Sequence, residues 1–421
     1  MSSTSAPGPE AQHEFLTRNV EEVLPAGALL ERLRAAAGER RPLRVKQGFD
    51  PTAPDIHLGH TVGLRKLREF QDLGHQVVLI VGDATARVGD PSGRNRTRPQ
   101  LSAHEIEAHA ATYLDQFFRV LEQSPAPPRL PVEVRHNLDW FARMGFFDVM
   151  RLLGTVTVSQ MLERDDFSRR FQAEQALGLH EMVYPLMQGW DSVEIRADVE
   201  IGGTDQKFNL VMGRDLQRLN GQPPQAVLTM PLIAGLDGEQ KMSKSYGNAI
   251  GVSEPPAEMF GKVMSAPDHL IGVWWRYVTA ADAAELAQVE RTLADRAANP
   301  MVLKKKLAGR IVALYHGEAE AERARERFET QFSRREIPTD LEQWPAEGAE
   351  MGIKDLLVRS GLARSGSEAW RAVDQGAVRI DQVKVTDRNH RQGLEKPFVL
   401  QLGRRMVRVV PAGDVGHRSR P

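Results

Sequence analysis

The sequence predicts a doubly wound α/β domain, followed by an α-helical domain and a small C-terminal α/β module. Strand and helix patterns alternate in the first half of the chain, a helical pattern follows, and the charge changes sign near the C-terminus. The chain has 421 residues, which is long for one hydrophobic core and favours two or three domains. Its content of 41% hydrophobic and 26% charged residues is ordinary for a globular protein.

The composition excludes several kinds of chemistry. The chain has no cysteine, which rules out disulfides, Cys-ligated zinc and thiol catalysis. Residues 1–12 are small and polar and lack the apolar stretch of a secretory signal, so we expect a disordered tail. No apolar run is long enough to span a membrane. These features predict a cytoplasmic protein without a membrane partner.

The α/β domain is expected over residues 13–252. Residues 43–50 and 76–82 are short β-branched runs, and residues 57–74 between them carry apolar residues at helical spacing up to a C-capping Gly74. Such a strand–helix–strand unit forms a right-handed crossover in a parallel sheet. Two more strands and a helix are expected at residues 131–137, 197–203 and 206–221. Ligands of this fold bind at the carboxyl ends of the strands.

The remaining segments differ in composition. Residues 253–335 have a helical pattern, and residues 336–350 are acidic with two prolines and are expected to be a linker. Residues 351–421 have the pattern of a small α/β module and carry 14 Lys and Arg against 7 Asp and Glu. A basic module on an otherwise acidic chain favours a polyanionic partner, most plausibly nucleic acid.

A loop with two lysines is the first candidate for chemistry. Lys241 and Lys244 stand three residues apart in the stretch KMSKS, between Gly238 and Gly247. Gly and Ser favour a mobile loop, and two ammonium groups on such a loop suit a polyphosphate. Taken alone, the same stretch also fits a solvated surface turn.

A second candidate is the stretch HLGH directly after the first strand. His57 and His60 lie on one face of the first helical turn, and Gly59 leaves room for a ligand near the backbone. The helix N-terminus adds N–H donors for phosphate oxygens. Helix capping, or a metal site without its third ligand, would explain the histidines equally well.

HLGH and KMSKS together resemble the two signatures of class I aminoacyl-tRNA synthetases. The stretches GFDPTAPDIHLGH, GDPSGRNRTR, YPLMQGWDSV, IGGTDQKFNL and LTMPLIAGLDG follow in the order and spacing of bacterial tyrosyl-tRNA synthetases. Residues 360–387 resemble an S4-type RNA-binding domain. The resemblance runs through the whole chain and implies a Rossmann-like catalytic domain and a homodimer. It also implies activation of L-tyrosine by ATP with Mg²⁺, transfer to tRNA(Tyr), and no tightly bound cofactor.

The resemblance gives roles to individual residues. Tyr184, Gln188 and Asp191 lie at helical spacing on one face, where a satisfied core cluster is the alternative interpretation. In the family, the amino group of tyrosine contacts Tyr184, Gln188 and Asp90, its hydroxyl contacts Asp191, and Asn137 and Gln206 complete the pocket. ATP contacts are implied for Asp50, Thr52, His57, Gly59, His60, Gly203, Asp205 and Lys244. The catalytic groups at the leaving pyrophosphate are His57, His60, Lys241 and Lys244.

Two positions depart from the best-known branch of the family. Lys46 stands on the first strand where that branch has a tyrosine, and Trp190 replaces a commoner tyrosine beside Asp191. Both substitutions raise the question of how the substrate hydroxyl is bound.

The basic residues are candidates for tRNA contacts. In the C-terminal module these are Arg364, Arg371, Arg379 and Lys384, with a solvated basic surface as the alternative. Arg94, Arg96 and Arg98 could contact RNA or solvent, and we expect solvent.

Three other functions remain open at this point. A tryptophanyl-tRNA synthetase shares the architecture and both signatures, and a synthetase-derived RNA-binding protein would share the fold without catalysis. Another nucleotidyltransferase with an H-x-G-H motif would leave the S4-like module unexplained.

Overall fold

A computed structural model of the chain describes residues 7–91, 102–295, 299–333, 341–381, 383–403 and 405–412. The chain forms two compact units, Met1–Arg325 and Glu326–Pro421. Arg94, Arg96 and Arg98 lie outside the described residues.

A six-stranded sheet forms the centre of the first unit, in the order β1-β6-β5-β2-β3-β4. Its strands are β1 (Glu22–Leu24), β2 (Arg44–Phe49), β3 (Gln76–Val81), β4 (Glu133–His136), β5 (Val199–Gly203) and β6 (Ala226–Met230). Strands β2 to β6 pair in parallel, and β1 adds an antiparallel edge to β6. The predicted doubly wound parallel sheet is therefore confirmed, with two strands that the sequence pattern did not reveal, the edge strand β1 and its neighbour β6.

The strand order places a crevice in the middle of the sheet. From β2 the chain continues through β3 and β4 to one side, and it returns through β5 and β6 on the other side. The connections therefore diverge at the carboxyl ends of β2 and β5, which is where open α/β sheets bind ligands.

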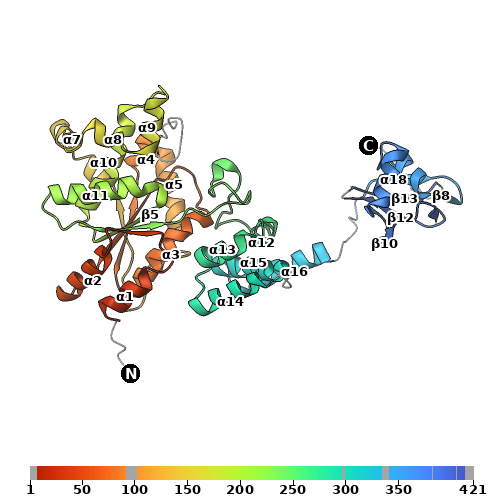
Figure 1. The fold of residues 1–421 in the computed structure, drawn as a ribbon, viewed down its shortest axis with the longest axis horizontal. Coiled ribbons are helices and arrows are strands. Elements are labelled where there is room, and N and C mark those ends of the chain that lie inside the picture. The colour runs from red at the N-terminus through yellow and green to blue at the C-terminus, as the bar shows by residue number, and fades with distance from the viewer. Residues whose placement is uncertain are drawn as a thin grey trace. The chain divides into compact units, whose positions relative to one another are not determined.

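Helices cover both faces of this sheet (Figure 1). Helices that reach the crevice include α3 (Leu58–Asp72), which follows β2, and α10 (Leu179–Glu194), which packs against α11 (Lys207–Leu219). Short 3-10 turns are η1 (Thr204–Gln206) and η2 (Lys244–Tyr246). The other helices are α1 (Pro9–Leu16), α2 (Ala28–Gly38), α4 (Thr85–Val88), α5 (Ala103–Phe117), α6 (Leu138–Phe141), α7 (Phe146–Leu153), α8 (Val158–Met161) and α9 (Asp165–Gln172).

The segment after the sheet is helical. Its helices are α12 (Pro256–Ser265), α13 (Leu270–Val278), α14 (Ala283–Ala294), α15 (Pro300–His316) and α16 (Glu318–Ser333). Helix α12 packs on α15, and Trp274 of α13 is fully buried. In the part of the chain that the structure describes, no helix is long and apolar enough to cross a membrane.

The N-terminal tail is shorter than expected. Helix α1 begins at Pro9, so the prediction of a disordered tail through residue 12 is wrong for its last residues. The ring of a proline at the first helical position fixes φ at a helical value, and its missing N–H is not needed there. Leu16 is fully buried, and the buried Lys66 donates to the carbonyl oxygens of Leu16 at 3.1 Å and Arg18 at 2.8 Å.

The second unit begins before the expected module boundary. Its five-stranded sheet has the order β10-β9-β12-β13-β7, and β8 pairs separately with β11. Its elements are β7 (Gln343–Ala346), β8 (Glu350–Gly352), α17 (Ile353–Arg359), α18 (Gly366–Asp374), β9 (Val378–Ile380), β10 (Val383–Val385), β11 (Arg391–Gly393), β12 (Phe398–Leu402) and β13 (Arg405–Pro411).

Strand β7 corrects the prediction of a linker at residues 336–350. It pairs in parallel with β13, Ala346 is buried in the core of this unit, and Trp344 packs against that core. The proline at position 345 suggested a linker, but on an edge strand a missing N–H is tolerated.

Candidate active site

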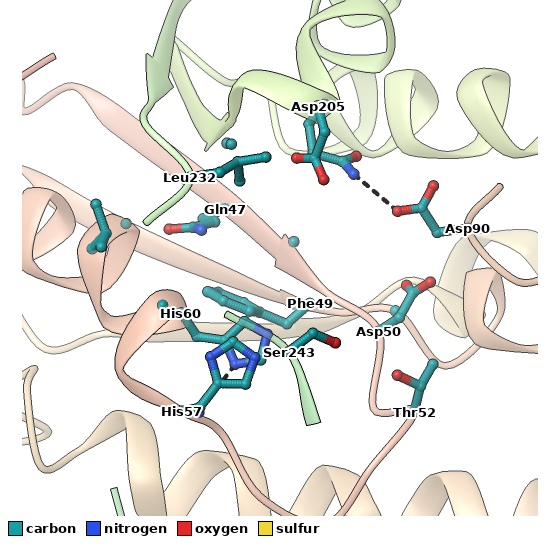
Figure 2. A pocket seen from close by; sticks show the side chains of 18 of the residues that line it. Gln47, Phe49, Asp50, Thr52, His57, His60, Asp90, Asp205, Leu232 and Ser243 are labelled. Atoms are coloured by element: carbon teal, nitrogen blue, oxygen red, sulfur yellow. Dashed lines mark hydrogen bonds between the residues drawn. The ribbon is translucent and has the colours of Figure 1, made fainter. Parts of the chain in front are cut away.

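A cavity of about 590 Å³ lies at the carboxyl ends of β2 and β5. It is lined by the predicted residues Asp50, Thr52, His57, Gly59, His60, Asp90, Tyr184, Gln188, Asp191, Gly203, Asp205, Gln206, Lys241 and Lys244. Figure 2 shows His57 and His60 together on one side, with Asp90 and Asp205 across from them. Residues far apart in the sequence are thus brought to one site at the predicted edge of the sheet.

The two signature stretches lie against each other. Leu58 at the start of α3 donates its N–H to the carbonyl oxygen of Ile250 at 2.9 Å, and His57 forms a β-bridge with Gly251. Met242 in the centre of KMSKS is only 5% exposed. A Cβ atom on Gly59 would lie 3.5 Å from the Cβ of Met242, so the glycine allows the loop to approach the first turn of α3 closely.

The two histidines form a stacked and largely buried pair. Their ring centroids are 3.8 Å apart, and the backbone N–H of His57 donates to Nδ1 of His60 at 3.2 Å. Burial lowers the pKa of His57 to about 2, assisted by His60, Lys244 and Lys241, and it lowers the pKa of His60 to about 4, assisted by the two lysines. Both rings are therefore neutral at pH 7, and they can donate N–H hydrogen bonds without carrying charge.

Both lysines of the loop are paired with carboxylates. Nζ of Lys241 lies 2.8 Å from Oδ2 of Asp205, and Nζ of Lys244 lies 2.6 Å from Oδ2 of Asp55. Each pair is partly exposed, so each stabilises the loop by about 0–1 kcal/mol. The mobility of this loop stays a prediction; in this structure its two ammonium groups lie at the cavity, with partners that a ligand could displace.

One wall of the cavity is rich in hydrogen-bond acceptors. The hydroxyl of Tyr184 donates to Oδ2 of Asp50 at 3.0 Å, and Oδ1 of Asp50 accepts a bond from Thr85 at 2.7 Å. Next to it, Nε2 of Gln206 donates to Oδ2 of Asp90 at 2.9 Å (Figure 2). Acceptors in this number suit an ammonium group, which has only donors.

Asp191 lies at the buried end of the cavity. It is 3% exposed and accepts hydrogen bonds from Nε1 of Trp140 at 3.0 Å and from Nδ2 of Asn137 at 3.4 Å. Burial raises the pKa of Asp191 to about 7, although Lys46 and the two donors oppose this shift. Asn137 is fully buried behind Asp191, so the structure places it as a partner of that carboxyl group and not on the cavity wall.

The ammonium group of Lys46 is fully committed to protein partners. Lys46 and Glu200 are 0% and 1% exposed, and their charged atoms are 3.0 Å apart. Nζ of Lys46 also donates to the carbonyl oxygen of Gln188 at 2.9 Å and to Oγ of Ser192 at 2.7 Å. An ammonium group has three N–H donors, so none is left for a substrate hydroxyl.

Trp190, the second departure from the family pattern, faces away from the cavity. Its ring packs against the apolar clusters that contain Leu186 and Ile195, and Nε1 donates to Glu194 at 2.8 Å. The residue therefore has a packing role in this structure.

Gln47 is a cavity residue that the sequence analysis missed. It lines the cavity, and its Oε1 atom is buried without a hydrogen-bond partner among the described residues. A Cβ atom on Gly63 of α3 would lie 2.5 Å from Nε2 of Gln47, so the glycine makes room for this side chain. A polar residue on a buried strand directly before HLGH was the signal that could have identified it.

The four candidate tRNA-binding residues of the second unit lie on or beside three elements, α18, β9 and β10. Arg379 on β9 and Lys384 on β10 face each other across the antiparallel pair, so their side chains share one face of the sheet. Arg364 precedes α18, where its N–H donates to Glu368 at 2.7 Å, and Arg371 lies on α18. Arg364, Arg371 and Lys384 are exposed.

Comparisons with known proteins agree with the site. The model of the family described as tRNA synthetases class I (W and Y) matches residues 38–333, and the S4 domain model matches residues 351–391. The tyrosine–tRNA ligase of Moorella thermoacetica is 48% identical over 94% of each chain. That of Salinibacter ruber is 47% identical over 96% of this chain and 98% of the relative.

Solved structures show the same fold. A C-terminally truncated mitochondrial tyrosyl-tRNA synthetase of Aspergillus nidulans superposes with a TM-score of 0.63 at 22% identity, over 77% of this chain and 94% of that one. The Archaeoglobus fulgidus tyrosyl-tRNA synthetase complexed with L-tyrosine gives a TM-score of 0.59 at 23% identity, over 75% and 99%.

The near full-length relatives carry the tyrosine name, which supports a tyrosine–tRNA ligase over the tryptophan enzyme and over the two remaining alternatives. The chain therefore belongs to the bacterial tyrosyl-tRNA synthetases, within the class I tRNA synthetases.

Proposed function

We propose that the cavity at the ends of β2 and β5 activates L-tyrosine with ATP, and that the protein then transfers the tyrosyl group to the 3′-terminal ribose of tRNA(Tyr). The observation that carries this proposal is the meeting of HLGH and KMSKS at one cavity whose buried end holds Asp191. The first two elements suit a polyphosphate, and the third suits a hydroxyl group.

The first step is an in-line substitution at phosphorus. An oxygen of the tyrosine carboxylate forms a bond to the α-phosphorus of ATP, and the bond to the bridging oxygen breaks with release of pyrophosphate. A carboxylate is already ionised at pH 7, so the step needs no general base. Catalysis then depends on positioning and on stabilising charge on the leaving group.

The groups that stabilise the pyrophosphate are His57, His60, Lys241 and Lys244. The uncharged imidazole rings donate N–H hydrogen bonds to the phosphate oxygens, which carry the negative charge. The lysines leave their carboxylate partners when ATP binds. If Asp205 binds the ribose, ATP itself takes away the partner of Lys241 and frees its ammonium group for the phosphates.

Magnesium enters with the nucleotide. The described residues contain no group of three or more His, Asp or Glu side chains that could hold a metal ion. In our proposal the protein therefore supplies few ligands, and Mg²⁺ arriving with ATP would offset the charge of its phosphates.

Tyrosine lies between the acceptor wall and Asp191. Its amino group contacts Tyr184, Gln188, Asp90 and Gln206, and its hydroxyl donates to Asp191. Trp140 and Asn137 hold the Asp191 carboxyl group in place. Because Lys46 has no free donor, hydroxyl recognition depends on Asp191.

The second step needs tRNA, for which the S4 unit offers Arg364, Arg371, Arg379 and Lys384. We also propose that the protein acts in the cytoplasm as a homodimer. An exposed apolar face on α7–α9 supports the dimer: Phe146 and Phe147 are 72% and 77% exposed, and Met150, Val158 and Phe171 are exposed as well. These helices lie close together in the first unit (Figure 1).

The test is ATP–pyrophosphate exchange without tRNA, with tyrosine, tryptophan and phenylalanine assayed in parallel. We expect strong exchange with tyrosine alone, because phenylalanine has no donor for Asp191 and tryptophan presents an indole N–H on a larger ring in place of the phenol hydroxyl. Exchange with tryptophan would keep the adenylating site and overturn the substrate. No exchange with any amino acid, from folded protein, would contradict the proposal.

A further inference from the structure

A buried asparagine joins two of the side chains that we place at the tyrosine amino group. Asn209 of α11 is 1% exposed. Its Nδ2 atom donates to Oε1 of Gln188 at 3.0 Å and to Oε1 of Gln206 at 2.9 Å. A carboxamide nitrogen has two N–H groups, so one is used for each glutamine.

Arg164 determines which way the Asn209 amide points. Nη1 of Arg164 donates to Oδ1 of Asn209 at 3.0 Å. A guanidinium group can only donate, so it requires the oxygen of Asn209 on its side and directs the nitrogen toward the glutamines. Arg164 is itself held in place, because it is 5% exposed, lies over the ring of Phe167, and pairs with Asp166 at 2.7 Å.

The orientation passes from Asn209 to the two glutamines. With their oxygens bound to Asn209, their nitrogens point the other way, that of Gln206 to Asp90 at 2.9 Å and that of Gln188 to Glu200 at 3.3 Å. Glu200 is a fixed acceptor because Lys46 is paired with it. An amide oxygen has two lone pairs, and one of them accepts from Asn209 in each glutamine.

The orientation matters because a carboxamide can turn by half a rotation and exchange its oxygen and nitrogen. An ammonium group needs acceptors, and a turned glutamine would offer it N–H donors instead. The low dielectric of a buried site makes such a mismatch costly.

We propose that Asn209, oriented by Arg164, is a positioning residue for the substrate: it fixes the carboxamides of Gln188 and Gln206 so that their oxygens accept from the amino group of tyrosine. This inference rests on the proposed function, which places those two side chains at the amino group. Asn209 touches neither reacting group and acts through its neighbours.

The experiment compares two ligands in three proteins. Dissociation constants are measured by calorimetry for L-tyrosine and for 3-(4-hydroxyphenyl)propanoate, which lacks only the amino group. The full-length proteins are the natural one, Asn209→Asp and Asn209→Leu. Asp keeps the acceptor for Arg164 and removes both donors, whereas Leu has a similar volume and carries no charge.

We expect both variants to reduce the preference for tyrosine over the analogue by about tenfold, the value of one hydrogen bond to a charged group. Affinity for the analogue should change less than about twofold, because its hydroxyl still reaches Asp191. The matched control is Asn220→Asp, an exposed asparagine at the opposite, C-terminal end of α11, which should leave both constants unchanged.

Several outcomes would overturn the inference. Equal weakening of both ligands would indicate general damage to the pocket, and an unchanged preference in both variants would show that Asn209 does not act on the amino group. If only Asn209→Asp or only Asn209→Leu loses the preference for tyrosine, the cause would be the new charge or partial unfolding. Thermal melts of the variants would distinguish these two causes. If the natural protein itself shows no preference for the amino group, the placement of Gln188 and Gln206 fails first, and the inference falls with it.

Discussion

At the scale of single residues, Asp191 is an acid that the fold keeps close to its protonated form. Its pKa is raised from 3.8 in the unfolded chain to about 7 by burial. Between these values the folded protein holds a proton that the unfolded chain has released. Stability is therefore lost as the pH rises through this window.

We predict that Asp191→Asn, which cannot ionise, gains stability relative to the natural protein between about pH 4 and pH 7, with a plateau on the order of 4 kcal/mol. Thermal melts of the ligand-free proteins across that range measure the difference. Asp215→Asn, at an exposed carboxylate paired with Arg218, serves as the control and should follow the natural protein. If the stability of Asp191→Asn and that of the natural protein depend on pH in the same way, the pKa of Asp191 is not raised.

The lysines of the loop lead to a kinetic prediction. Lys244→Ala should lower the rate of tyrosyl-adenylate formation by roughly 10²-fold or more, because it removes an ammonium group that stabilises the negative charge on the leaving pyrophosphate. Tyrosine affinity should stay nearly constant. Lys262→Ala removes an ion pair with Glu254 at 2.8 Å and is the matched control with a normal rate. Rapid-quench measurement of adenylate decides, and a normal rate for Lys244→Ala would refute its role.

Single residues also show what a sequence can and cannot predict about a site. HLGH and KMSKS could be paired in advance because together they resemble the two signatures of class I synthetases, although each alone also fits other interpretations. Lys46 could be noticed but not interpreted, since its partners Glu200 and Ser192 come from β5 and α10. The sequence around Asn209 does not reveal its role. That role depends on its hydrogen bonds with Arg164, Gln188 and Gln206, which only the folded structure brings together.

At the scale of elements, β7 is the instructive case. Its sequence, QWPA, lies in an acidic stretch with two prolines and no alternating pattern. It becomes a strand only because β13 offers a parallel partner, more than 60 residues later in the chain. Strand β3 is different, because its β-branched run is buried on both faces and can be recognised from the local sequence.

This difference leads to a prediction about fragments. A fragment of residues 341–421 should be more stable than one of residues 351–421 by about 2 kcal/mol, because the shorter one loses the packing of Trp344 and Ala346. Urea unfolding measures both. Replacing the exposed Gln343 by alanine in the longer fragment is the control and should change little. Equal stability of the two fragments would mean that β7 is dispensable.

At the scale of the whole molecule, the proposed dimer can be tested at the exposed apolar face on α7–α9. Replacing Phe146 and Phe147 together by aspartate should convert the proposed dimer into a monomer. Four phenyl rings, two from each subunit, would be replaced by carboxylates, which are costly to bury at an interface. Light scattering at micromolar concentration measures the mass. Leu219→Asp, at a 64% exposed leucine on α11, is the control and should remain dimeric. A natural protein that is already monomeric would end the proposal.

The parallel pairing of β7 with β13 also has a consequence for the making of the protein. The first strand of the C-terminal unit finds its partner in the last one, and core residues Val407 and Val409 lie on that last strand. Until the ribosome has translated β13, β7 has no partner strand and its backbone edge is exposed to solvent. The C-terminal unit can complete its fold only after residue 411 has left the ribosomal exit tunnel. A messenger RNA truncated within the codons of β13 should therefore yield a chain whose first unit is folded and whose C-terminal unit is not.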